Sequence, residues 1–157
     1  VQAAKHQGAS VIECLVNCVI FNNGTHNWIA DREMRTERSI VLHHGEKMIF
    51  GKNQDKGLAL DYSQGIIPQL IVVHADDNRV LTHDAKTTDP TLHRMLAMMG
   101  QEDSAALQPL PIALGVIRMV EDSTYDMSVN QQINQVREQS NVKSFDELTA
   151  TLEQWEI

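Results

Sequence analysis

The first apolar stretch of this chain has the pattern of a half-buried β-strand. Residues 9–17 are rich in β-branched and aliphatic side chains, with apolar residues at the even positions and polar residues among the odd ones. The preceding residues 1–8 carry basic side chains shortly before Gly8, which is typical of the end of a helix. A helix end, a glycine and a strand in succession predict the helix-to-strand step of an α/β sheet.

Later apolar segments predict further strands. Residues 40–50 alternate around a glycine-containing turn, which predicts a β-hairpin. Residues 56–61 and 69–74 are separated by a loop that contains glycine and proline, and each segment predicts a strand. Residues 109–120 are mostly apolar and predict a last strand.

Charged and amphipathic segments predict helices between and after these strands. A short charged helix is expected over 31–39, and the Asp-Pro pair at 89–90 provides an N-cap and a favoured first residue for another. The apolar face of this second helix consists of Leu92, Met95, Leu96 and Met99. Two amphipathic helices are expected over 128–139 and 144–156, the latter opening with a capping box. The prediction is one compact α/β unit with a helical end.

The acidic charge balance argues against two classes of binding partner. Thirteen Lys and Arg residues against twenty-one Asp and Glu residues give a formal net charge of −8. An acidic surface repels nucleic-acid phosphates and anionic lipid, so neither nucleic acid nor a membrane surface is an expected partner. No apolar run approaches the roughly 18–20 residues of a spanning helix. Two cysteines cannot make a disulfide framework, which indicates a reducing, cytoplasmic setting. Because the chain lacks an initiator Met and opens at a helix end, we expect it to be part of a longer protein.

The two cysteines are the first candidates for chemistry. If residues 9–17 form a strand, Cys14 and Cys18 lie ~13 Å apart, too far for a disulfide or a shared metal ion. Cys14 falls on the apolar face and is expected to be a small buried side chain. Cys18 falls where the strand gives way to an Asn/Gly turn. Strand ends in open α/β sheets face the ligand crevice, which makes Cys18 the better functional candidate.

The histidines offer weaker candidates. Seven are scattered along the chain, and none has the spacing of a metal-binding helix. His43 and His44 would point to opposite faces of a strand, so they cannot chelate one ion together. His74 with the acidic pair at 76–77 could bind a metal, although a polar loop after a strand explains the same residues. The chain contains no nucleophile elbow, phosphate-binding loop or dinucleotide fingerprint.

A longer pattern carries a family resemblance. Residues 8–24 fit G-x-[ST]-x-[VI]-E-x-x-x-x-C-x-x-[FY]-N-[DN]-G, a segment of the thiamine-diphosphate-binding β subunit of 2-oxoacid:ferredoxin oxidoreductases. Further matches follow in order at 44–46, 50–51, 56–58, 81–84, 111–118 and 124–126. The resemblance spans roughly residues 3–130, and the His-Gly-Glu run with a long tail is most similar to the 2-oxoglutarate-using enzymes.

The resemblance implies cofactors and one site residue. In the family, thiamine diphosphate and Mg²⁺ bind through a G-D-G motif that would lie upstream of this chain, as would three of the four cysteines that hold a [4Fe-4S] cluster. Cys18 matches the fourth cluster ligand, and a thiolate suits iron–sulfur ligation. Asn17 and residues 22–24 would supply turn geometry and hydrogen bonds to the cluster sulfurs. No catalytic residue is assigned to this chain, and no cofactor is expected to bind it alone.

The resemblance also implies a domain plan and an activity. Residues 1–157 would form the C-terminal part of the β subunit, with 1–30 ending the thiamine-diphosphate-binding open sheet and 31–157 forming an α+β extension. The complete enzyme would convert a 2-oxo acid and CoA to acyl-CoA with electrons passing to ferredoxin, and its other subunit, α, would be a partner of this chain. Two alternatives are a non-catalytic α/β interaction module without a redox role and a small His-site metalloprotein.

Overall fold

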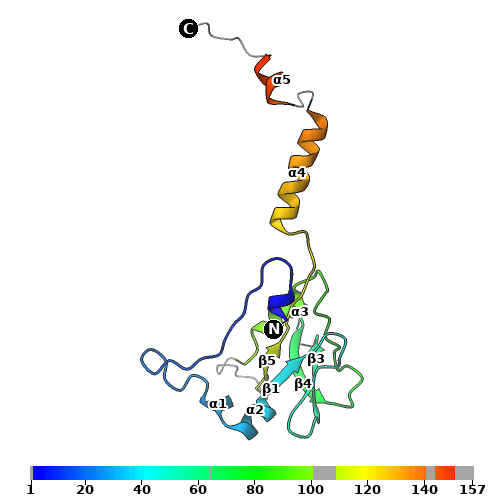
Figure 1. Cartoon of the computed structure of the whole chain (residues 1–157). Helices are drawn as coiled ribbons and strands as arrows, with labels where there is room; N and C mark the ends of the chain where they lie inside the picture. The colour runs from blue at the N-terminus through cyan, green and yellow to red at the C-terminus, as the bar shows by residue number, and fades with distance from the viewer. Residues whose placement is uncertain (1, 64, 101–108, 141–143, 151–157) are drawn as a thin grey trace. The chain divides into compact units, whose positions relative to one another are not determined.

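The computed structural model describes residues 2–63, 65–100, 109–140 and 144–150. Contacts divide the chain into a larger unit, Cys14–Glu121, and a smaller unit formed by Val1–Glu13 with Asp122–Ile157. Helices and strands are mixed, and both a parallel and an antiparallel sheet are present, so the expected α/β class is confirmed (Figure 1).

An antiparallel sheet forms the most regular part of the larger unit. It contains β2 (Ile49–Phe50), β3 (Lys56–Asp61) and β4 (Gln69–His74) in that order, with Leu58 of β3 opposite Val72 of β4. The strands predicted over 56–61 and 69–74 are therefore confirmed. Their apolar runs form strands because β3 is buried through its centre, where Leu58 is fully shielded from solvent.

The second sheet joins segments that are distant in the sequence. Strand β1 (Ser39–Leu42) pairs in parallel with β5 (Ile112–Gly115), the strand predicted within 109–120. The hairpin predicted over 40–50 is wrong, because β1 and β2 belong to different sheets. The turn at Gly45 does form, with a φ of 84°, but its two flanks pair with other parts of the chain. A local alternation pattern reports burial and cannot identify a pairing partner.

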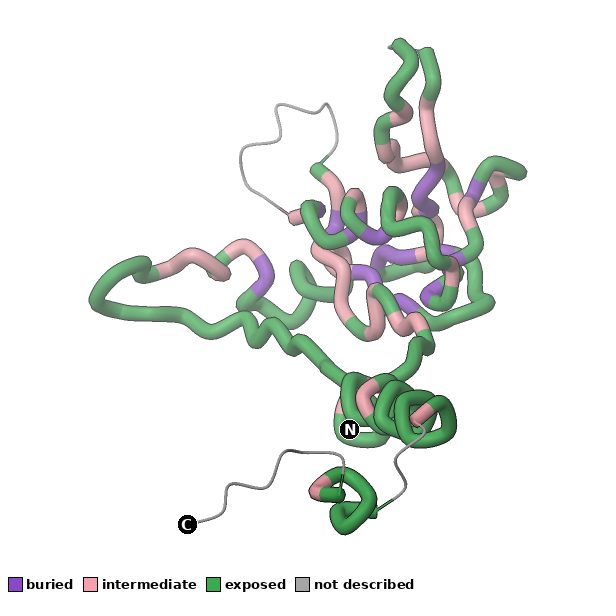
Figure 2. Tube along the Cα trace, turned by 90° about the horizontal axis from the view of Figure 1, so that it is seen from above, coloured by how far each residue is buried: buried purple, intermediate pink, exposed green. Residues whose placement is uncertain are grey.

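Short helices complete the larger unit. Helix α2 (Arg32–Arg38) confirms the short charged helix expected over 31–39, and the Asp31 side chain caps it by accepting from two backbone N–H groups. A further short helix, α1 (Asn27–Ala30), precedes it and was not expected. Helix α3 (Thr91–Ala97) confirms the helix predicted after the Asp-Pro pair, and Leu96 is fully buried. The buried apolar core consists of Ile40, Leu42, Met48, Phe50, Leu58, Leu96 and Met99. Among the described residues, all those that are buried belong to the larger unit, and Figure 2 draws buried residues in purple.

The strand predicted over residues 9–17 is wrong. This segment pairs with none of the described residues, and every one of its side chains is exposed. A strand gains its backbone hydrogen bonds from a neighbouring strand, and the described chain supplies none here. Cys14, expected to be buried, is exposed for the same reason. The helix end expected before Gly8 is the short 3₁₀ helix η1 (Ala3–Lys5), and Gly8 adopts the positive φ of 108° that its position requires.

Two exposed helices lie in the smaller unit. Helix α4 (Tyr125–Gln139) confirms the helix expected over 128–139 and begins three residues earlier. Helix α5 (Phe145–Ala150) starts at the predicted capping box, where the Glu147 N–H donates to the Ser144 hydroxyl at 3.2 Å. The rest of that predicted helix, residues 151–156, lies outside the described residues. No helix in the described ranges has the length and apolar character needed to cross a membrane.

Candidate functional site

Cys18 lies in a tight turn that leaves its thiol exposed. The Asn22 N–H donates to the Cys18 carbonyl at 3.0 Å, which closes the turn 18–22 as an isolated antiparallel bridge. Backbone N–H groups of Phe21 and Ile20, and more weakly Asn22, donate toward the sulfur and lower the pKa of the Cys18 thiol from its ordinary value of 9.0. The turn therefore favours a thiolate, which is the form of cysteine that reacts and binds metals.

The Asn17 side chain stabilises the same turn through two hydrogen bonds. Its Oδ1 accepts from the Gly24 N–H at 2.9 Å, and its Nδ2 donates to Asn23 Oδ1 at 3.2 Å. Gly24 has a φ of 82°, and a Cβ there would lie 2.9 Å from the side-chain nitrogen Nδ2 of Asn27. The expectation that Asn17 and residues 22–24 supply the turn geometry around Cys18 fits these contacts. Their hydrogen bonds to cluster sulfurs remain a prediction.

The Cys18 thiolate is suited to be one ligand of a metal cluster, and the other ligands would have to come from elsewhere. An exposed thiolate with several backbone N–H donors aimed at its sulfur suits a ligand of an iron–sulfur centre. Within the described residues, no group of three or more His, Cys, Asp and Glu side chains could hold a metal ion. Cys18 would therefore have to share an ion or cluster with ligands that this part of the chain does not supply.

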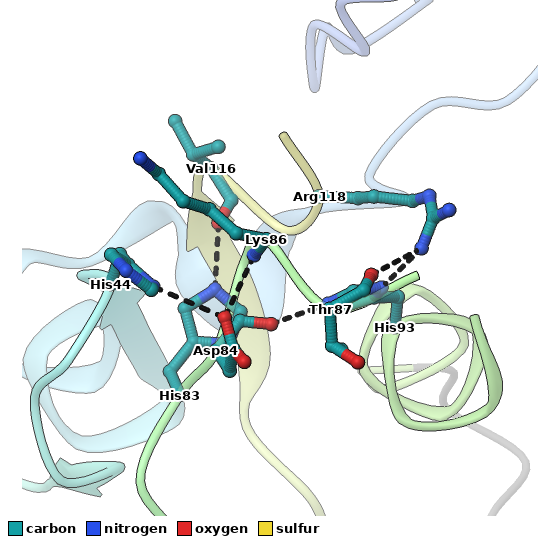
Figure 3. A network of polar contacts seen from close by, with 8 residues as sticks. All are labelled: His44, His83, Asp84, Lys86, Thr87, His93, Val116 and Arg118. Atoms are coloured by element: carbon teal, nitrogen blue, oxygen red, sulfur yellow. Dashed lines mark hydrogen bonds and ion pairs between the residues drawn. The ribbon is translucent and has the colours of Figure 1, made fainter. Parts of the chain in front are cut away.

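A second polar cluster is built around two buried histidines (Figure 3). His83 is 1% exposed and lies before α3, and His93 is 3% exposed and lies within it. The His83 Nε2–H donates to the Val116 carbonyl at 2.9 Å, just after β5. The His93 Nε2–H donates to the Asp84 carbonyl at 2.8 Å. The two rings meet edge to face with centroids 6.2 Å apart, so three distant segments converge here.

Arg118 completes this cluster. Its guanidinium donates to His93 Nδ1 at 3.0 Å and to the carbonyls of Thr87 and Thr88 at 3.0 and 3.1 Å. Because a guanidinium can only donate and a carbonyl can only accept, His93 must be neutral, with its proton on Nε2. On the other side, the Asp84 carboxylate accepts from the Lys86 N–H at 2.9 Å and lies 3.4 Å from His44 Nδ1.

His83 carries an unsatisfied nitrogen. With Nε2 donating to Val116, its Nδ1 is a bare acceptor that finds no hydrogen-bond partner within the described residues. Burial lowers the pKa of His83 below 6.5, and its bond to the Val116 carbonyl only partly opposes this. Both histidine rings are therefore neutral, and His83, His93 and Arg118 together form a structural cluster, the histidine clasp. Its tight internal bonding leaves no ring nitrogen of His93 free for a ligand.

Sequence reasoning missed this clasp because its members are far apart along the chain. Histidine spacing alone gave no sign that His83 and His93 meet, and Arg118 was not singled out by its charge. One signal was present: residues 81–84 and 111–118 are both among the matches to the oxidoreductase β subunits. Of the other histidine candidates, His74 is exposed and lies 3.4 Å from an oxygen of Asp76.

Comparison with curated proteins confirms the resemblance to the β subunits of 2-oxoacid:ferredoxin oxidoreductases. The chain is 29% identical over 136 residues to a protein of Mycobacterium tuberculosis (strain ATCC 25618 / H37Rv), 2-oxoglutarate oxidoreductase subunit KorB. The matched region is 83% of this chain and 33% of that relative, so the chain spans about a third of the relative's length. No protein-family profile and no solved structure matches the chain. At the family level, the match relates the chain to a subunit of an oxidoreductase.

Proposed function

We propose that this chain is the C-terminal portion of the β subunit of a cytoplasmic 2-oxoacid:ferredoxin oxidoreductase that uses 2-oxoglutarate. The observation that carries the proposal is the exposed Cys18 thiol, held in a turn whose N–H groups lower its pKa, at the position that matches a cluster ligand of the family. The name and match length of the mycobacterial relative support the subunit assignment.

The complete enzyme would oxidatively decarboxylate the 2-oxo acid. One 2-oxo acid, one CoA and two oxidised ferredoxins would give acyl-CoA, CO₂, two reduced ferredoxins and one proton, which comes from the CoA thiol. Thiamine diphosphate with Mg²⁺ supplies the carbanion chemistry when bound, and a [4Fe-4S] cluster supplies one-electron transfer. The α subunit and ferredoxin are the proposed protein partners. Both cofactors would depend mainly on polypeptide outside this chain.

The role of this chain in that reaction is to deliver one cluster ligand. The amides of Phe21 and Ile20 stabilise negative charge on the Cys18 sulfur, so that the thiolate forms at a lower pH than in an ordinary cysteine. The bonds from Asn17 to Gly24 and Asn23 keep the turn in the shape that presents those amides. Asn17 is thus a positioning residue for the thiolate.

The test is a Cys18→Ser substitution in the complete β subunit, purified with its α partner. We expect loss of the visible absorbance of the cluster, loss of bound iron and loss of ferredoxin reduction. Cys14→Ser is the matched control, since Cys14 is the other exposed thiol and lies four residues away. A Cys18→Ser enzyme that keeps its iron and its ferredoxin reduction would overturn the proposal.

A second candidate function rests on a different observation. Six large apolar residues near the start of the chain are at least 69% exposed: Val11, Ile12, Val16, Val19, Ile20 and Phe21. An apolar segment of this kind marks an interaction surface, as expected for a non-catalytic interaction module. That alternative predicts a nearly silent Cys18→Ser change. Cofactor binding tests a separate part of the first proposal, since stoichiometric binding of thiamine diphosphate and Mg²⁺ to this chain alone would contradict a site located upstream.

A further inference from the structure

The turn after Cys18 is followed by the one Asn-Gly pair of this sequence, Asn23–Gly24. The Asn23 side chain is exposed, so water can reach its amide group. Gly24 has no Cβ, so no side chain hinders the approach of its backbone nitrogen to the side-chain carbon Cγ of Asn23. Attack of that nitrogen on Cγ closes a succinimide ring, which makes the pair chemically labile.

The reaction at this pair consumes only water. After the Gly24 N–H has lost its proton, the nitrogen attacks Cγ of Asn23, so that an N–Cγ bond forms and the bond from Cγ to Nδ2 breaks. The Nδ2 amide group takes up a proton and leaves as ammonia. Water then opens the succinimide at either carbonyl, which leaves aspartate or isoaspartate in place of Asn23. No electrons are transferred.

Hydrogen bonds from Asn17 hold both reacting groups apart in the folded chain. The Gly24 N–H donates to Asn17 Oδ1 at 2.9 Å, and the Asn17 Nδ2 donates to Asn23 Oδ1 at 3.2 Å. The Gly24 carbonyl also accepts from the Asn27 N–H at 2.9 Å, so the next peptide group is fixed as well. The Gly24 nitrogen must leave Asn17 before it can turn toward Cγ, and the free energy of that hydrogen bond adds to the barrier.

We propose that Asn23 is a deamidation site of this chain and that Asn17 restrains the reaction by holding the Gly24 N–H. The reaction requires neither iron nor thiamine diphosphate, so it is independent of the function proposed above. The loss of one hydrogen bond corresponds to about fivefold in rate, which means that Asn17 slows the reaction and does not abolish it.

The first test follows the peptide that contains Asn23 by mass spectrometry while the full chain is incubated at mildly alkaline pH. We expect Asn23 to deamidate before any other asparagine, and about fivefold faster in Asn17→Ala than in the parent chain. The parent chain unfolded in guanidinium chloride should react at least as fast as folded Asn17→Ala, because unfolding removes the same bond. Earlier reaction of another asparagine, or equal rates in Asn17→Ala and the parent, would overturn the proposal.

The matched variant is Asn17→Asp, which keeps an oxygen that accepts from the Gly24 N–H. The Asn23 amide can rotate so that its Nδ2 donates to the new carboxylate. We expect Asn17→Asp to deamidate no faster than the parent, and Asn53→Ala, which changes another exposed asparagine, to match the parent. Circular dichroism verifies that each variant is folded. A folded Asn17→Asp chain as fast as Asn17→Ala would show that the held N–H is not the restraint, and would overturn the proposal.

Deamidation also adds a negative charge beside the turn 18–22, whose backbone N–H groups stabilise the Cys18 thiolate. A neighbouring carboxylate disfavours a thiolate, because like charges repel. In a Cys14→Ser background, Asn23→Asp reproduces the aspartate product, and it should move the midpoint of Cys18 alkylation to higher pH. Asn53→Asp adds the same charge in the loop between β2 and β3 and should leave the midpoint unmoved. An unmoved midpoint in Asn23→Asp would overturn this coupling between deamidation and the thiolate.

Discussion

One guanidinium nitrogen of Arg118 lies 3.0 Å from Nδ1 of His93, although 25 positions separate the two residues in the sequence. The same guanidinium contacts the carbonyls of Thr87 and Thr88, so it joins the segment after β5 to the start of α3. Because His93 is almost fully buried, this contact satisfies a nitrogen that would otherwise have no partner in a dry environment.

Arg118→Ala should therefore destabilise the fold. The substitution removes three hydrogen bonds and leaves His93 Nδ1 buried without a donor, at a cost of about 1–2 kcal/mol in the free energy of unfolding. Urea denaturation measures the change. Arg79→Ala is the control, since Arg79 is itself exposed and bonds only Asp77 among the contacts described, so its loss should have little effect. Equal stability of the Arg118→Ala and parent chains would show that the clasp is not structural.

His83 should make the stability of the larger unit depend on pH. Its pKa is lowered by burial in the folded state, so the unfolded chain binds a proton more readily. The contribution of neutral His83 is fully present above pH 6.5 and is lost as the pH falls through the lower pKa of the folded state. Urea midpoints between about pH 7.5 and 5 measure this loss, since carboxylates such as Glu37 titrate below this range.

The matched variant for this test is His83→Gln. A glutamine amide can still donate to the Val116 carbonyl but cannot gain a proton. We expect the pH dependence between pH 7.5 and 5 to flatten in His83→Gln and to persist in His74→Gln, because His74 is exposed. An unchanged slope in His83→Gln would assign the pH dependence to another group.

The sequence correctly predicted those helices and strands whose partners are neighbouring segments of the chain. The apolar runs at 56–61 and 69–74 became β3 and β4, and the Asp-Pro pair preceded α3, because each pattern is satisfied by neighbours in the chain. Pairing between distant segments was not predictable in this way. The hairpin over 40–50 failed because β1 pairs with β5, some 70 residues later.

The candidate site was predictable only in part. Cys18 was identified by its position before an Asn/Gly turn and by resemblance, and the structure adds the donors around its sulfur. The buried clasp could not be predicted, since His83 and Val116 are 33 positions apart and their contact depends on the completed fold. A strand over 9–17 was indicated by its composition, yet composition cannot supply the neighbouring strand that it needs.

Gly57 is expected to tolerate no side chain. A Cβ at this position of β3 would lie 2.5 Å from a methyl carbon of Val80, which is itself buried. Gly57→Ala should lower the free energy of unfolding by about 1–3 kcal/mol through overpacking. Adding Val80→Ala removes the methyl groups that clash, so the double variant should be more stable than the sum of the two single effects. Simple additivity in the urea midpoints would mean that the two side chains do not compete for space.

Cys18 should alkylate as a thiolate at lower pH than an ordinary thiol. The backbone donors from Phe21 and Ile20 lower its pKa from 9.0, so the pH midpoint of its reaction with iodoacetamide, measured in a Cys14→Ser chain, should fall below that value. Asn17→Ala removes the bonds to Gly24 and Asn23 that hold the turn, and should move the midpoint back toward 9.0. Asn130→Ala in α4 changes another exposed asparagine and should leave the midpoint unmoved. If the Cys14→Ser chain reacts with a midpoint of 9.0 or above, the turn does not stabilise the thiolate, and Cys18 loses the property that suits it to bind iron.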